Sequence, residues 1–86
     1  MELHFYSSTF CEPCMHTRVV LEEVKRLVPS VTVREFDVAS SNARAEAAGV
    51  RAVPTVILVG DDEVERFRAA GEPSLNQVLV AIAKAL

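Results

Sequence analysis

The chain has 86 residues, half of them apolar, which is enough for one small domain over residues 1–86 with a single core. Its formal net charge of −3 argues against a nucleic-acid partner, because phosphate binding relies on clustered Lys and Arg. The longest apolar runs are too short to span a bilayer, and residues 1–4 lack the basic start and apolar core of a secretory signal. We therefore expect a cytoplasmic protein that has no membrane partner.

A short strand is expected over residues 3–6, and the chain's only two cysteines follow it in the run Cys11-Glu12-Pro13-Cys14. A helix should begin at or just after Cys11, because Pro13 suits a first helical turn and would be costly deeper inside. A disulfide between residues three apart closes a very small loop, so it would stabilise the fold little. The pair therefore indicates a redox site rather than a structural crosslink.

The residues after the motif repeat at helical period and predict one apolar stripe. Its members are Cys14, Val20, Leu21, Val24, Leu27 and Val28. On such a helix Cys14 faces the core, while Cys11 stays exposed at the helix start.

The middle of the chain alternates strand and helix signals. Residues 31–38 are rich in β-branched side chains and predict a second strand, and residues 43–48 predict a short helix that is stopped by Gly49. Residues 55–59 are nearly continuous Val, Ile and Leu, which is typical of a central strand covered on both faces.

A turn at residues 60–62 leads into an expected edge strand at residues 64–67, which carries charged side chains. The run Ser74-Leu75-Asn76-Gln77 is a capping box that begins the last helix. The expected core stripe of this helix is Leu75, Val78, Leu79, Ile82 and Leu86. The resulting order is βαβαββα, with a parallel βαβ unit first and a hairpin plus helix last.

With these elements in place, the chain resembles the thioredoxin superfamily over nearly its whole length. Cys11–Cys14 has the Cys-x-Pro-Cys form typical of thioredoxins, and Val53-Pro54-Thr55 is similar to the family's second signature, in which the proline is cis. The length is that of a glutaredoxin. The resemblance therefore implies an α/β thioredoxin fold of glutaredoxin size, with a mixed four-stranded sheet flanked by three helices.

The resemblance also implies a role for each site residue. Cys11 would be the nucleophile, because a helix N-terminus favours its thiolate, and Cys14 would be the resolving thiol. Glu12 and Pro13 would tune the redox potential, with the carboxylate of Glu12 opposing the thiolate. Val53 and Pro54 would bind substrate, Val53 through backbone hydrogen bonds to an extended chain.

Two residues depart from the thioredoxin pattern, and others depart from the glutaredoxin pattern. Phe5 stands where thioredoxins carry a buried Asp, and Phe10 stands where they carry Trp. Glutaredoxins usually have a Lys at the position of Ser8 in this chain. They also have a Gly-Gly-x-Asp stretch that binds glutathione, and residues 70–73 of this chain stand at that position. Because the glycine pair and the Asp are missing, glutathione is the weaker candidate for the electron donor.

Several other polar residues near the motif have ordinary interpretations. His16 is expected to be a surface histidine, His4 a packed strand residue, and Asp37 a strand-end carboxylate rather than a substitute for the missing Asp. The hydroxyls of residues 7–9 could donate to the Cys11 thiolate, although loop hydroxyls usually bond to water or backbone.

The function implied by the resemblance is a cytosolic thiol–disulfide oxidoreductase that reduces protein disulfides, acts as a monomer and holds no cofactor. Its electrons would come from an NADPH-dependent flavoprotein thioredoxin reductase. One alternative is a glutaredoxin that depends on glutathione. Another is a non-catalytic metal-binding module with Cys11, Cys14 and His16 as ligands, but structural zinc almost always takes four protein ligands and only two thiolates are present, so we expect no metal.

Overall fold

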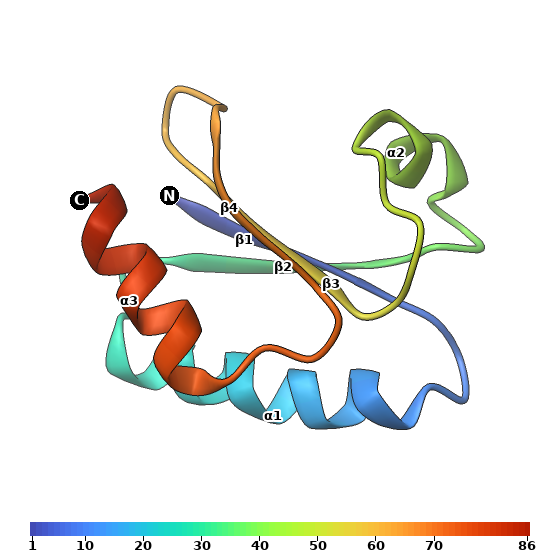
Figure 1. Ribbon diagram of the computed structural model, residues 1–86, viewed down its shortest axis with the longest axis horizontal. Coiled ribbons are helices and arrows are strands. Elements are labelled where there is room, and N and C mark those ends of the chain that lie inside the picture. Colours follow the sequence, from blue (N-terminus) through green and yellow to red (C-terminus); the bar gives the residue numbers. More distant parts are fainter.

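Four strands and three helices follow one another as βαβαββα in the computed structural model, which describes residues 1–86 (Figure 1). The strands form one mixed sheet in the order β2-β1-β3-β4, so β1 and β3 are central. This confirms the fold class predicted from the sequence. The elements are β1 (Glu2–Ser7), α1 (Glu12–Leu27), β2 (Thr32–Asp37), α2 (Asn42–Ala47), β3 (Thr55–Val59), β4 (Glu65–Ala70) and α3 (Leu75–Ala85).

The pairing of β1 with its two neighbours places the active-site end of the sheet. β1 runs parallel to β2, with Phe5 beside Glu35 and Ser7 beside Asp37. It runs antiparallel to β3, where Tyr6 pairs with Thr55. The ends of β1 and β2 therefore lie at the same edge of the sheet as the start of β3.

Alternating side chains of the central strands supply two separate cores. Leu3 and Phe5 of β1 belong to the larger cluster, on the face that α1 and α3 cover. Tyr6 and Ile57 point to the other face, where Ala45 of α2 covers them (Figure 1). Both faces of β1 and β3 are thus buried, which explains the unbroken apolar run of β3.

The buried stripe of α1 consists of Cys14, Thr17, Leu21 and Val24. The burial of Cys14 confirms the prediction from the helical spacing. The inclusion of Leu27 in that stripe was wrong, because its side chain is exposed. At 100° per residue, Leu27 lies well to one side of the line that Leu21 and Val24 follow, on a flank of the helix.

The second half of the chain differs from the sequence prediction in two places. β4 covers Glu65–Ala70 rather than residues 64–67, because Ala69 and Ala70 pair with the start of β3. Leu86 was expected in the core of α3 but is 89 % exposed, since the helix ends at Ala85. The capping box is confirmed, with the Ser74 hydroxyl accepting a hydrogen bond from the Gln77 N–H at 3.1 Å.

Other expectations are met within a residue or two at each element end. Gly49 follows α2 with a φ of +70°, a left-handed conformation that favours glycine at a helix end. No helix combines the length and the apolar character needed to cross a bilayer.

Replacing a buried and an exposed leucine tests how much each contributes to the stability of the fold. Leu58 is fully buried in the larger cluster, whereas Leu86 is 89 % exposed. We expect Leu58→Ala to lower the free energy of unfolding by about 3 kcal/mol, because it leaves a cavity in a packed core. Leu86→Ala is the matched control and should cost less than about 0.5 kcal/mol. Urea unfolding measures both, and equal losses would contradict the core described above.

Candidate active site

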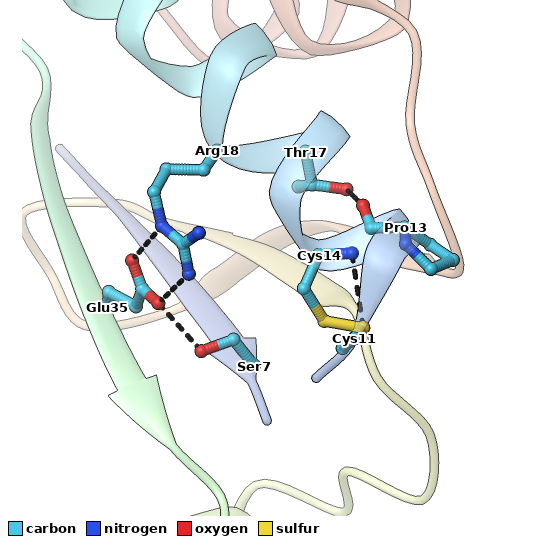
Figure 2. A network of polar contacts seen from close by, with 7 residues as sticks. All are labelled: Ser7, Cys11, Pro13, Cys14, Thr17, Arg18 and Glu35. Atoms are coloured by element: carbon cyan, nitrogen blue, oxygen red, sulfur yellow. Dashed lines mark hydrogen bonds and ion pairs between the residues drawn. A yellow bond between two sulfur atoms is a disulfide. The ribbon is translucent and has the colours of Figure 1, made fainter. Parts of the chain in front are cut away.

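The two cysteines are joined by a disulfide at the start of α1, with their Cα atoms 5.1 Å apart (Figure 2). Cys11 is the N-cap residue and has extended backbone angles, φ −103° and ψ 104°. Its Sγ accepts a hydrogen bond from the Cys14 N–H at 3.1 Å. A sulfur in this position faces one of the unpaired N–H groups of the first helical turn, which favour negative charge on it.

The two sulfurs differ in their exposure to solvent. Cys14 is 1 % exposed and belongs to the core cluster, whereas Cys11 is partly exposed at its edge. Pro13 lies in the first turn as predicted, and its carbonyl accepts a hydrogen bond from the buried Thr17 hydroxyl at 2.8 Å. Glu12 is exposed and begins the helix beside Cys11.

The second predicted element, Val53-Pro54, directly precedes β3. The Val53–Pro54 peptide bond is cis, as the resemblance implied. Thr55, which directly follows Pro54, pairs with Tyr6 at the end of β1, and the loop to Cys11 leaves β1 at this end, so the two motifs lie at the same edge of the sheet. The Pro54 carbonyl accepts a hydrogen bond from the Gly71 N–H at 2.8 Å, which ties this segment to the end of β4.

The backbone of Val53 is free of hydrogen bonds within the protein. The residue lies outside the helices and strands, and no backbone bond among the turns and loops involves its N–H or C=O. Backbone groups are strong donors and acceptors that are nearly always satisfied by protein or water. The N–H and C=O of Val53 are therefore unpaired within the protein.

Two aromatic residues take the places where the sequence departs from the thioredoxin pattern. Phe5 is buried in the core cluster, so an apolar ring occupies that position in place of a carboxylate. Phe10 is fully exposed and has a φ of +59°, which is uncommon for a bulky residue. Its side chain lies in solvent immediately before Cys11.

An ion-pair network that the sequence did not predict lies beside the disulfide (Figure 2). Arg18 of α1 donates two hydrogen bonds to Glu35 of β2, from Nε at 3.0 Å and from Nη2 at 2.5 Å. The hydroxyl of the buried Ser7 donates to the same carboxylate at 2.7 Å. Hydrogen bonds from Arg18, and to a smaller extent from Ser7, hold the pKa of Glu35 below its ordinary range, against the opposing effect of partial burial.

The sequence contained only a partial signal for this network. Arg18 stands four residues after Cys14, and Ser7 is a polar residue at the end of β1. Their partner Glu35 becomes predictable only with the pairing register of β1 and β2, because it lies 17 residues from Arg18. The interpretation of Ser7 as a loop hydroxyl that usually bonds to water or backbone was wrong, since Ser7 lies in β1 and its hydroxyl donates to the side chain of Glu35.

The remaining polar residues lie as the sequence suggested. His16 is 60 % exposed, and its Nδ1 is 3.3 Å from a carboxylate oxygen of Glu72. The Asp37 carboxylate accepts hydrogen bonds from the backbone N–H groups of residues 39 and 40, so it is a strand-end carboxylate. His4 is largely buried and bonds to Glu2. No three His, Cys, Asp or Glu side chains come together as a metal site would need.

Comparison with known proteins gives one consistent result. The family model Thioredoxin matches residues 2–84. A thioredoxin of Methanocaldococcus jannaschii is 30 % identical over 87 residues, which cover 100 % of this chain and 96 % of the relative. A thioredoxin of Chlamydia muridarum is 39 % identical over 62 residues, covering 71 % of this chain and 61 % of the relative. The matched segment thus spans under two thirds of that chlamydial protein.

Solved structures agree with the sequence comparison. A mutant thioredoxin from Halobacterium salinarum superposes with a TM-score of 0.89 at 27 % identity. The match covers 98 % of this chain and 73 % of that one. The arrangement of strands and helices described above is therefore shared along almost the whole chain.

The ion-pair network makes a prediction about acid stability. Because the pKa of Glu35 is lowered in the folded state, its ionised form stabilises the protein above the ordinary Glu pKa of about 4.3. This contribution is lost as the pH falls through the lowered value. The unfolding free energy of the wild type should exceed that of Glu35→Gln most at neutral pH, and the difference should shrink toward pH ~3.

Urea unfolding at several pH values measures this difference. Glu46→Gln is the matched control, because Glu46 is exposed and makes no ion pair. Its stability difference from the wild type should stay small and flat with pH. A difference for Glu35→Gln that is constant across the range would contradict the role of the carboxylate charge.

Proposed function

Because this chain belongs to the thioredoxin family, we propose that it reduces disulfide bonds in other proteins through the Cys11–Cys14 pair. The observation that carries the proposal is the unequal placement of the two sulfurs. Cys11 is partly exposed at a helix N-terminus, and Cys14 is buried in the first turn of the same helix. This arrangement supports a dithiol in which one sulfur meets the target and the other completes the reaction.

The proposed reaction begins with the reduced dithiol. The Cys11 thiolate attacks one sulfur of the target disulfide, forming a mixed disulfide, and the other target sulfur leaves as a thiolate that takes up a proton. The Cys14 thiol then loses its proton and attacks the Cys11 sulfur. The second target sulfur leaves, the Cys11–Cys14 disulfide closes, and two electrons have passed to the target. The structure corresponds to the oxidised product of this cycle.

The target is proposed to bind as an extended segment against Val53. The free N–H and C=O of Val53 support this mode, because an extended chain can pair with both groups as a strand would. Val53 also lines a shallow, largely apolar hollow together with Val38, Ala45 and Val50. Binding through the backbone of the target depends little on the target's side chains, which suits an enzyme that accepts several protein substrates.

The roles of Glu12 and Pro13 follow from their position between the cysteines. Pro13 fixes the first turn of α1 and so the spacing of the two sulfurs. The exposed Glu12 carboxylate opposes the neighbouring thiolate and makes the reduced form less favourable. A reducing role of this kind fits the cytoplasm, where thiols are kept reduced, with an NADPH-dependent flavoprotein reductase as electron donor.

Replacing each cysteine tests the assigned roles. Cys11→Ser should abolish reduction of a protein disulfide, because it removes the attacking sulfur. Cys14→Ser should instead accumulate a mixed disulfide with the substrate, because nothing resolves it. Gel electrophoresis without reductant, with insulin as substrate, measures the trapped species. If Cys11→Ser traps the substrate as well as Cys14→Ser does, the assignment of nucleophile and resolver is wrong.

The electron donor is tested by coupled turnover. With NADPH and thioredoxin reductase, the protein should reduce insulin at least ~10-fold faster than with glutathione and glutathione reductase, since the glycine pair and Asp of a glutathione grip are missing from residues 70–73. The consumption of NADPH, followed by its absorbance, measures both rates. Turnover with the glutathione system alone would overturn the thioredoxin role and establish the glutaredoxin alternative.

A further inference from the structure

A pair of opposite charges stands on one flank of the active-site helix, next to the cysteines. Arg18 and Glu35 are joined by two hydrogen bonds, and Ser7 anchors the same carboxylate (Figure 2). The three residues come from α1, β2 and the end of β1. Because Ser7 is buried and directly precedes the loop that leads to Cys11, the pair is fixed at the base of the active-site loop.

The guanidinium of Arg18 lies close to residues that pack around the buried sulfur. Arg18 follows Cys14 by four residues, so the two side chains are neighbours on the helix surface. Its guanidinium carbon is 5.7 Å from the centre of the Phe5 ring, and Phe5 and Cys14 belong to the same buried cluster. An apolar ring screens charge far less than water does, but both side chains of the ion pair are more than a third exposed, so solvent screens the charge of the guanidinium in part.

We propose that Arg18 and Glu35 are positioning residues that act on the reduced cysteines with opposite signs, Arg18 favouring the Cys11 thiolate and Glu35 limiting that effect. The physical basis is that the ion pair is a dipole held in a fixed orientation, not a freely moving pair of surface charges. Removing either charge leaves the other uncompensated beside the site. Without Glu35, the remaining charge of Arg18 stabilises the thiolate. Without Arg18, the remaining charge of Glu35 destabilises it.

Apart from this pair and the cysteines, three titratable side chains lie on the first turns of α1 or against them. Glu12 adds a carboxylate beside Cys11 at the helix start. His16 and Glu72 form a pair on the opposite flank of α1, with both side chains well exposed. Arg18 holds the pKa of the Glu35 carboxyl below its ordinary range, so this carboxylate is a weaker base than an ordinary Glu.

The inference deepens the proposed dithiol function and rests on it. The experiment is therefore chosen to be independent of any protein substrate. It measures the rate at which iodoacetamide alkylates Cys11 in the reduced protein at about pH 6, where only part of the thiol is ionised. Mass spectrometry assigns the label to Cys11 rather than to the buried Cys14.

The expected changes have opposite signs. Arg18→Gln should slow alkylation about threefold and Glu35→Gln should speed it about threefold, the size expected of a partly screened charge about one helical turn away. The double variant should return near the wild-type rate. Arg18→Lys keeps the charge but not the two-pronged geometry, so it should stay close to the wild type. A slowing in Arg18→Lys as large as in Arg18→Gln would overturn the proposal.

The chain offers a matched control pair on the same helix. Arg26 also donates two hydrogen bonds to Glu23, about two turns further from the cysteines. Glu23→Gln and Arg26→Gln should leave the alkylation rate unchanged. Rates that move in the same direction in Arg18→Gln and Glu35→Gln, or that equal those of the control pair, would show that the network only supports the fold and would overturn the proposal.

Salt separates a charge effect from a loosened structure. At about 1 M salt the Debye length is about 3 Å, so the rate differences should largely disappear if they arise from charge. The salt experiment also tests the proposal if Arg18→Gln does not fold. A salt-sensitive rise of the alkylation rate in Glu35→Gln supports the proposal, and the absence of a rise overturns it. Opposite shifts in a protein that fails to reduce insulin would refute the proposed function and leave this inference standing.

Discussion

The docking of α1 on the sheet is the constraint on which the rest of the site depends. Its buried stripe begins at Cys14 and continues through Leu21 and Val24 into the larger core. Once this stripe is buried, the rotation of the helix is fixed, and Cys11 is left at the exposed helix start. The burial of apolar surface thus determines which sulfur meets solvent and which is shielded.

The flanks of the same helix are held by polar contacts of different character. On one side Arg18 reaches across to β2, where the carboxylate of Glu35 is also bonded to Ser7. On the other side His16 faces Glu72, next to the segment that holds Pro54 through Gly71. The first turns of α1 therefore make polar contacts with the neighbouring segments on both flanks. Chemistry at a thiol depends on such a defined surrounding, because its reactivity follows from nearby charge and solvent.

Much of the active-site helix and of its two cysteines was predictable from the sequence, because the relevant signals are local. The spacing of Cys11 and Cys14, the position of Pro13 and the start of the buried stripe of α1 are all short-range patterns, and each was met. The capping box of α3 was equally local. The errors occurred where an element ends or where a partner strand extends it, as at Leu86 and at Ala70. Local propensity cannot fix such boundaries, since tertiary pairing supplies the missing hydrogen bonds.

By itself, the sequence determined the redox pair, the order of the elements and, through the family resemblance, a second motif with a cis-proline. The tertiary structure alone decided what surrounds the pair. It placed Glu35 beside Phe5 through the parallel register of β1 and β2, and so within reach of Arg18 and Ser7. The physical reason is that a register depends on the whole βαβ unit and its packing, whereas the sequence displays only the charges that the register brings together.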